Sequence, residues 1–343
     1  MENSNMFKKI PLVLLAGLLM AGCAREDSLN TGEKAQRYLE QFIQKYYPYV
    51  TPNEYGIFVL EETPGNGLPW SQDSLYTYAS TTIRSLGGVI ASTQEEKVAQ
   101  QLGTYVKGNY YGPRFQQTGE NLSYAGLDAL LSGMRVGGTR KAIIPACLLT
   151  TSRYASFKEY LAKGTQEQSL EYTVTLGGQV NDIERMETDS LARFVLRTYG
   201  KEVKPIRYKE DVAEGSFYFI SDTTEFIGKR KIPADTTLKI NYTGRLLNGQ
   251  VFDTTLEKTA KDAGIYNPAK TYSTANLTVT TNYTEIKLND NSVIEGFRAG
   301  ISRMHWVGQK GIVLFVSNLG YANSGSGQTI PPYSPLLFEL ELL

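Results

Sequence analysis

The residues whose types and spacing could do chemistry lie in the stretch NYTGRLLNGQVFDTT, residues 241–255. It predicts two strands joined at Asn248-Gly249, a dipeptide that strongly favours a two-residue hairpin turn. The second strand ends with Phe252 beside Asp253, a large aromatic ring next to a carboxylate. An aspartate on a strand is usually solvated. The pair by itself therefore indicates either a plain surface strand or the rim of an apolar pocket.

Further motifs along the chain favour the pocket. In order, they are Tyr242-Thr243-Gly244, Phe252-Asp253, VIEGF at 293–297, Met304, Gly308, GYANSGSG at 320–327 and IPPYSPLLFELEL at 330–342. This set resembles the FKBP family of peptidyl-prolyl cis-trans isomerases over residues 235–343. The resemblance is specific because it rests on an ordered set rather than on one short motif.

The resemblance implies a role for each matching residue. The catalytic residues would be Tyr242, Phe252, Asp253 and Tyr321, and the substrate-binding residues would be Val293, Ile294, Phe297, Ile330 and Phe338. Phe297 would form the floor under the substrate proline ring. The Ile294 backbone N–H and the Tyr321 hydroxyl would hold substrate carbonyl groups. Asp253 would anchor Tyr242 or polarise the twisting amide.

The sequence departs from the family pattern at four places. One extra residue lies between Met304 and Gly308, and a family aromatic has no secure counterpart, since Tyr283 or Thr284 could fill its place. Phe297 stands where the family usually has a tryptophan. Residues 256–292, with a predicted short helix and a Thr-rich run, separate the hairpin from VIEGF by more than compact members carry. The effect of this insertion on access to the pocket is left open.

Composition argues against several other kinds of chemistry. The single histidine, His305, cannot build a His-rich metal site, and its position after Met304 indicates an exposed loop. Cys147 has apolar neighbours, as is typical of a small buried side chain. We therefore expect no metal and no cofactor. The formal net charge of zero gives no electrostatic reason to expect a nucleic acid partner.

The N-terminus predicts export and lipidation. Lys8 and Lys9 precede an apolar run at 10–20 and then Ala-Gly-Cys23, which is the order of a secretory signal. Cys23 in this context resembles the lipidated cysteine of a bacterial lipobox. We expect a signal peptide over 1–22 and a tether over 23–30. The acidic start of the tether resembles those of Bacteroides-type surface lipoproteins, and it is also compatible with a plain solvated linker.

The chain repeats one plan twice. Five segments match in order: GEKAQRYLEQFIQKYY with TDSLARFVLRTYG, RSLGGVIAST with RLLNGQVFDT, EEKVAQQLGTY with EKTAKDAGIY, YAGLDALLSGM with IEGFRAGISRM, and SLEYTVTL with PLLFELELL. Each copy has several strands, a short helix and a preceding amphipathic helix. We therefore predict an α+β protein with two FKBP-like domains, each an antiparallel twisted sheet wrapped around a short helix. The predicted boundaries are 31–182, a helix and linker over 183–234, and 235–343.

The first copy lacks the residues of the pocket. Ala91-Ser92 stands in place of Phe252-Asp253, and Leu127 in place of Phe297. We expect the first copy to fold without isomerising, as a degenerate accessory domain. Its role could be to hold substrate, to dimerise or to act as a spacer.

The sequence thus predicts an enzyme, a peptidyl-prolyl cis-trans isomerase of FKBP type. It would be anchored by lipid to the outer membrane, on the periplasmic face or the cell surface, and would act on proline-containing segments of exported polypeptides. Two alternatives stay open, a non-catalytic peptide-binding or chaperone lipoprotein and a structural surface lipoprotein. The natural substrates and the oligomeric state are also open.

Overall fold

The protein is described by a computed structural model. It describes residues 29–118, 125–152, 154–166, 168–208, 215–221, 231–233, 235–280 and 285–343. The predicted signal peptide and the lipidation site Cys23 lie outside these residues. None of the helices within them is long and apolar enough to cross a membrane.

The described chain forms two compact units. The first ends at Gln101 and resumes from Gln116 to Asn181, and the second consists of Leu102–Phe115 together with Asp182–Leu343. A short segment from the first half of the chain therefore belongs to the second unit.

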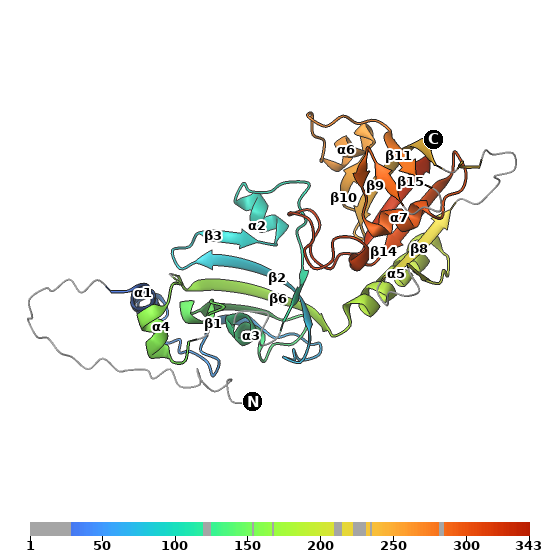
Figure 1. The fold of residues 1–343 in the computed structure, drawn as a ribbon. Helices are drawn as coiled ribbons and strands as arrows, with labels where there is room; N and C mark the ends of the chain where they lie inside the picture. The colour runs from blue at the N-terminus through green and yellow to red at the C-terminus, as the bar shows by residue number, and fades with distance from the viewer. Residues whose placement is uncertain are drawn as a thin grey trace, which may run out of the picture. The chain divides into compact units, whose positions relative to one another are not determined.

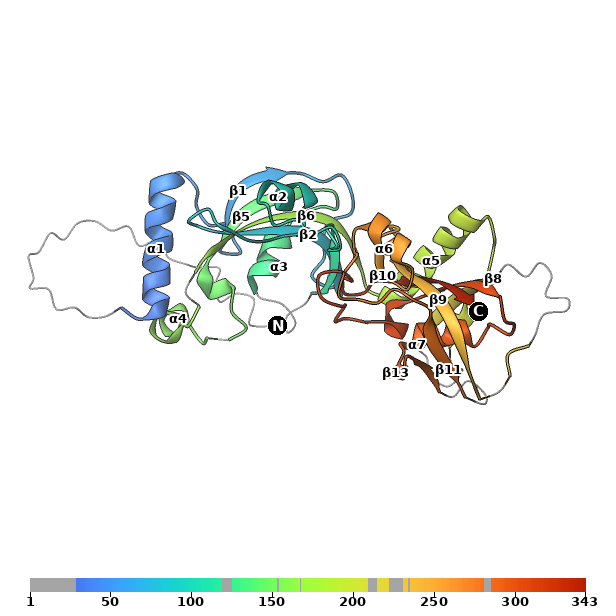
Figure 2. The same ribbon diagram turned by 90° about the horizontal axis from the view of Figure 1, so that it is seen from above.

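The first unit is an antiparallel sheet with short helices (Figure 1). Its elements are α1 (Thr31–Tyr46), β1 (Phe58–Thr63), β2 (Tyr76–Ser85), β3 (Ile90–Thr93), α2 (Glu96–Gln101), β4 (Arg114–Gln117), α3 (Ala125–Leu131), β5 (Thr139–Ile144), η1 (Ala146–Leu148), α4 (Phe157–Lys163) and β6 (Leu170–Val180). The strand order is β1-β5-β6-β2-β3, and β4 also pairs with β2. Helix α1 packs against α4, as seen from above in Figure 2.

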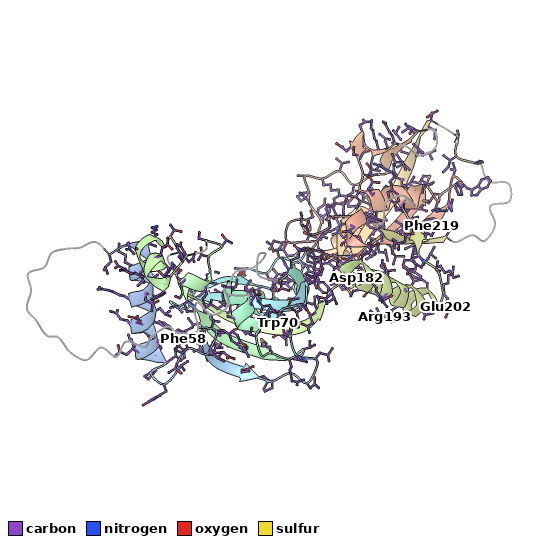
Figure 3. All side chains as sticks on the ribbon, turned by 60° about the horizontal axis from the view of Figure 1, so that its bottom comes forward. Phe58, Trp70, Asp182, Arg193, Glu202 and Phe219 are labelled. Atoms are coloured by element: carbon purple, nitrogen blue, oxygen red, sulfur yellow. The ribbon has the colours of Figure 1, made fainter. Side chains whose placement is uncertain are left out.

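Local signals explain how these elements begin and pack. Asn30 is the N-cap of α1: its side chain accepts from the Glu33 N–H at 3.1 Å, while the Glu33 side chain accepts from the Asn30 N–H. The core under α3 is tight, because a Cβ at Gly126 would lie 2.4 Å from Ile144. Trp70 belongs to this core (Figure 3). Its indole N–H donates a hydrogen bond to Thr77 at 3.0 Å, so this buried polar group is paired.

The second unit repeats this plan with additional strands. Its elements are α5 (Ile183–Tyr199), β7 (Ile206–Arg207), β8 (Ser216–Ser221), β9 (Thr236–Leu246), β10 (Val251–Thr254), α6 (Glu257–Ala263), β11 (Ala275–Val279), β12 (Ile286–Leu288), β13 (Asn291–Ser292), α7 (Glu295–Ile301), β14 (Lys310–Phe315), η3 (Ser317–Leu319) and β15 (Leu336–Leu342). The strand order is β13-β12-β11-β9-β15-β14-β8-β7, with β10 paired to β9. The run β8-β14-β15-β9 thus corresponds to β1-β5-β6-β2 of the first unit.

Helices cover both faces of the second sheet. A Cβ at Gly296 of α7 would lie 2.3 Å from the Phe315 ring, so α7 packs directly on β14. Helix α5 lies on the other face, where the Tyr218 hydroxyl donates to the Thr188 carbonyl at 3.4 Å. Tyr218 pairs with Leu314, and along both strands these residues alternate with the residues that face α7. Their side chains therefore point to the opposite face of the sheet. The buried core of the unit includes residues from both layers.

The predicted fold class is confirmed. Each unit is an antiparallel sheet with a short helix packed on it, and a longer helix, α1 or α5, precedes each sheet. Helix α6 ends at Gly264, which adopts the left-handed conformation that favours glycine.

Candidate functional site

Strands β9 and β10 bring the tyrosine and the aspartate of the hairpin together. The Tyr242 hydroxyl donates a hydrogen bond to Asp253 Oδ2 at 2.7 Å. The pairing of β10 with β9 skips Phe252, because Val251 is opposite Arg245 whereas Asp253 is opposite the adjacent Gly244. This β-bulge bends β10 and re-aims its side chains, a feature often found beside active sites.

Four aromatic rings form an apolar cup next to this hydrogen bond. Phe297 and Phe338 meet edge to face with centroids 5.3 Å apart, and Tyr242 lies 5.8 Å from Phe297. Phe252 meets Phe338 at 5.5 Å, also edge to face. Phe297 and Phe338 are buried, whereas Tyr242 and Phe252 are partly exposed. The cup therefore has a closed floor and an open rim.

Steric crowding explains why position 244, in the Tyr-Thr-Gly motif, is a glycine. A Cβ on Gly244 would lie 2.6 Å from the Phe252 ring and 2.9 Å from the Phe338 ring. Phe338 is also the partner of Gly244 in the β15–β9 register. The two rings therefore occupy the space that any side chain at position 244 would need.

Burial and the Asp253 carboxylate raise the pKa of both tyrosine hydroxyls at the site. The pKa of the Tyr242 hydroxyl is raised far above its usual value, first by burial and then by the Asp253 carboxylate. The same two causes, in the same order, raise the pKa of Tyr321. Both hydroxyls are therefore protonated and can act as hydrogen-bond donors at neutral pH.

The remaining predicted site residues belong to the same core cluster. Ile330 is buried in it, and Tyr321, Val293 and Ile294 pack against it with partial exposure. Ile294 is the N-cap of α7, directly before the helix that carries Phe297. Eight of the nine residues that the resemblance selected thus belong to this cluster or pack against it, and the ninth, Asp253, is hydrogen-bonded to Tyr242. Their roles stay predictions.

The sequence analysis missed a cation at the rim. Lys270, in the insertion between α6 and β11, forms an ion pair with Asp253 Oδ1 and donates to the Thr254 carbonyl at 3.2 Å. Asp253 therefore has Tyr242 on one oxygen and Lys270 on the other. No local pattern marks Lys270, because its partner is fixed only when the insertion folds back over β10.

A buried acid behind the site was also missed. Glu187, on α5, accepts hydrogen bonds from the Ser317 backbone N–H at 2.6 Å and from Ser317 Oγ at 2.7 Å. Ser317 begins η3, the turn that leads into the segment carrying Tyr321. Burial is the main cause that raises the pKa of Glu187, to about 7. A single glutamate within an amphipathic helix gives no sequence signal for this role.

The first unit has the same hairpin pairing as the second unit but lacks the aromatic ring and the carboxylate. The Thr82 and Thr93 hydroxyls lie 2.8 Å apart, as the Thr243 and Thr254 hydroxyls do at 2.9 Å in the second unit. The pairing of β3 with β2 skips Ala91, where Phe252 stands in the second copy. Ala91 supplies no ring and the neighbouring Ser92 no carboxylate.

Other reactive side chains lie apart from the cup. His305 is exposed, as predicted, and Cys147 is buried, with burial raising the pKa of its thiol to about 12. Among the described residues, no group of three or more His, Cys, Asp or Glu side chains could hold a metal ion.

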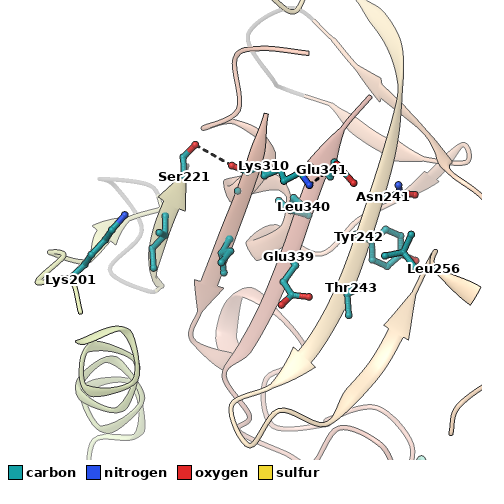
Figure 4. A pocket seen from close by; sticks show the side chains of 13 residues that line it. Lys201, Ser221, Asn241, Tyr242, Thr243, Leu256, Lys310, Glu339, Leu340 and Glu341 are labelled. Carbon is teal, nitrogen blue, oxygen red and sulfur yellow. Dashed lines mark hydrogen bonds and ion pairs between the residues drawn. The ribbon is translucent and has the colours of Figure 1, made fainter. Parts of the chain in front are cut away.

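A groove of about 440 Å³ lies on the second sheet, lined by residues of β8, β9, β14 and β15 that include Tyr242 (Figure 4). By strand alternation, Thr243 and Glu339 point away from the aromatic cup. The acids in this groove are paired, Glu341 with Lys310 at 3.0 Å and Glu339 with Arg245 at 3.2 Å.

Comparisons with known proteins show which sequences this chain resembles. A family model for FKBP-type peptidyl-prolyl cis-trans isomerases matches residues 228–343. FK506-binding protein 2 of Dictyostelium discoideum is 31% identical over 113 residues, which is 33% of this chain and 68% of that protein. An FK506-binding protein of Neisseria meningitidis serogroup B is 31% identical over 124 residues, 36% of this chain and 92% of that protein.

Longer relatives are matched over part of their length. The chain spans 36% and 45% of two other curated bacterial relatives. Among solved structures, the crystal structure of AtFKBP13 is similar with a TM-score of 0.27 and 21% identity, over 37% of this chain and 90% of that one.

Proposed function

Because this chain belongs to the FKBP-type peptidyl-prolyl cis-trans isomerase family, we propose that its second unit catalyses cis-trans isomerisation of Xaa-Pro bonds. The observation that carries the proposal is the hydrogen bond from Tyr242 to Asp253 at the rim of the aromatic cup. It unites a dry site for a proline ring with polar groups beside the bond that must rotate.

The reaction needs no nucleophile. An Xaa-Pro bond resists rotation through amide resonance, with a barrier of about 20 kcal/mol. In the twisted transition state the resonance is lost, and the carbonyl oxygen carries less negative charge. An apolar site that excludes water favours this state over the hydrated planar amide. Lowering the barrier by about 4 kcal/mol would accelerate rotation about a thousandfold.

The described geometry supports a role for each part of the cup. The buried Phe297 ring would lie under the proline ring, with Phe338 and Phe252 as walls. The protonated Tyr321 hydroxyl and the Ile294 N–H would donate to substrate carbonyls. Asp253, held by Tyr242 and Lys270, would face the twisting amide at the open rim.

We further propose that the first unit is a degenerate copy and that the protein acts in the cell envelope. The repeated strand order and the bulge at Ala91 support common descent of the two units. The predicted signal and the lipidation of Cys23 support attachment to the outer membrane, where exported polypeptides would be the substrates.

The test is proline exchange measured by NMR on a short peptide, using residues 24–343. The matched variant carries Asp253→Leu and Tyr321→Phe and is shown to be folded by circular dichroism. We expect the parent to accelerate exchange and the variant to lose most of the acceleration. A folded parent that binds the peptide without accelerating exchange would show a peptide-holding protein instead.

A further inference from the structure

One loop design occurs twice in the second unit, once from each half of the chain. The loop at 103–111, named loop A, follows α2, and the loop at 264–272, named loop B, follows α6. Both begin with a glycine of positive φ, 69° in loop A and 71° in loop B. Loop A lies in the segment Leu102–Phe115, which is part of the second unit.

A pair of tyrosines closes each loop in the same way. In loop A the Tyr105 and Tyr111 rings stack at 5.3 Å, and the Tyr111 hydroxyl accepts from the Val106 N–H at 3.1 Å. In loop B the Tyr266 and Tyr272 rings stack at 5.3 Å, and the Tyr272 hydroxyl accepts from the Asn267 N–H at 3.0 Å. The two loops therefore share one internal structure, even though their other residues differ.

Loop B directs one side chain to the hairpin of the site. Lys270, the fourth of the five residues between its two tyrosines, forms the ion pair with Asp253. At the corresponding position loop A has Asn109, and Tyr110 follows it. The shared frame thus carries different side chains to the same unit.

Loop A binds both the flap and the hairpin of the site. The flap is defined here as residues 320–330, which carry Tyr321 and Ile330. The Tyr110 N–H donates to the Gln328 carbonyl in the flap at 2.8 Å. On the hairpin side, Gln250 Nε2 donates to the Gly108 carbonyl at 2.9 Å. Loop A therefore connects the two chain segments that border the aromatic cup.

The side chain of Tyr110 reinforces this connection. Its ring packs against the core cluster that also contains Phe297, Ile330 and Phe338. Its hydroxyl donates to the Pro113 carbonyl at 3.0 Å, and Arg114 donates to the Tyr110 carbonyl at 3.0 Å. Tyr110 is thus held by its own segment while its backbone holds the flap.

We propose that Tyr110 is a positioning residue for the isomerase site, which holds the flap in the conformation that binds the peptide. The inference rests on the proposed function of the second unit. It also assigns a function to part of the first sequence copy, because loop A, which would position the flap, follows α2 of that copy. A flap that is already ordered favours peptide binding. The apparent affinity for the peptide is proportional to the fraction of molecules whose flap has the binding conformation.

The experiment compares variants of residues 24–343 with one matched control. Tyr110→Ala removes the ring from the core, and Gln250→Ala releases loop A from the hairpin without touching the cup. Val106→Ala is the control, because its side chain is 54% exposed and its backbone bond to Tyr111 remains. Two quantities are measured, the KM and kcat for a proline peptide and the hydrogen exchange of the amides of residues 320–330.

We expect Tyr110→Ala to raise KM about 3- to 10-fold with kcat within about twofold of the parent, because less of the protein has an ordered flap. Exchange of the flap amides should accelerate by a similar factor. Gln250→Ala should give a smaller change in the same direction, and Val106→Ala should match the parent.

A folded double variant, Tyr110→Ala with Gln250→Ala, that keeps the parent's flap exchange overturns the inference. A parent without isomerase activity would remove the proposed function, while the exchange data would still decide whether loop A holds the flap. The two proposals therefore fail on different measurements.

Discussion

Glu187 and Ser317 join the helix before the second sheet to the turn that leads into the flap. The Glu187 carboxylate accepts hydrogen bonds from the backbone N–H and the hydroxyl of Ser317, at 2.6 and 2.7 Å. Glu187 is only 1% exposed. A buried carboxylate is costly when it is ionised, even with two donors. This relationship makes the second unit sensitive to pH.

The first prediction concerns the pKa of Glu187 and the way in which stability depends on pH. Burial raises the pKa of Glu187 from 4.5 to about 7, so the folded state favours the protonated acid. The resulting stabilisation is fully present below about pH 4.5 and is lost as pH rises through about 7. Its upper limit is about 3 kcal/mol, from the size of the shift.

Glu187→Gln should therefore flatten the dependence of the free energy of unfolding on pH between 4.5 and 7. Urea unfolding at several pH values measures it, with the exposed Glu202→Gln as control. An unchanged slope in Glu187→Gln would contradict the prediction.

The second prediction concerns the hydroxyl of Tyr242. Tyr242→Phe keeps the ring in the cup and removes the donor to Asp253. We expect kcat/KM to fall about 3- to 10-fold, because a hydrogen bond to a charged group is lost at the reacting site. Tyr266→Phe, which removes a hydroxyl from loop B, is the matched control. Equal rates for the two variants would remove Tyr242 from the mechanism.

The third prediction concerns the ion pair at the rim. Lys270→Met removes the cation beside Asp253, and both side chains are 40% exposed. We expect the free energy of unfolding to change by less than about 1 kcal/mol, because exposed pairs are screened. We expect kcat/KM to fall several-fold, because Asp253 loses the contact that fixes one of its oxygens. Lys258→Met removes an exposed pair with Asp262 on α6 and should leave the rate unchanged.

The fourth prediction tests the space above Gly244. Gly244→Ala forces the Phe252 or Phe338 ring to move, since the new Cβ would lie within 2.9 Å of both. We expect a loss of about 1–3 kcal/mol in stability together with loss of activity. Gly178→Ala is a strand glycine with room, its nearest neighbour being Tyr78 Cβ at 4.0 Å. Thermal unfolding and proline exchange of both variants provide the comparison, and a parent-like Gly244→Ala would contradict it.

The fold could be predicted where its signals are local. Asn248-Gly249 marks the predicted hairpin, and nearby residues also set helix ends, with Asn30 and Glu33 capping α1 and Gly264 ending α6. These signals depend on the conformational preferences of a few neighbouring residues. The repeat of motifs along the chain likewise predicted two sheets with preceding helices.

The site could be predicted only in part. The residues of the aromatic cup were expected because an ordered set of motifs resembles the FKBP family, and that resemblance implied roles for Phe297 and Phe338. Lys270 and Glu187 could not be found, since neither belongs to a sequence pattern that marks its partner: Asp253 lies 17 residues before Lys270, and Ser317 lies 130 residues after Glu187. Such contacts are selected by the packing of the whole unit and not by local propensity.

The sequence by itself determined the hairpin, the repeated plan of helices and strands, and the set of residues expected at the site. Only the tertiary structure decided that Lys270 and Tyr242 share Asp253, and that Tyr110 from the first half of the chain binds Gln328 in the second. The physical reason is sequence separation. A strand or a turn is favoured by its own residues, whereas a contact between positions 110 and 328 is favoured only when the segments between them have folded and offset its loop-closure entropy.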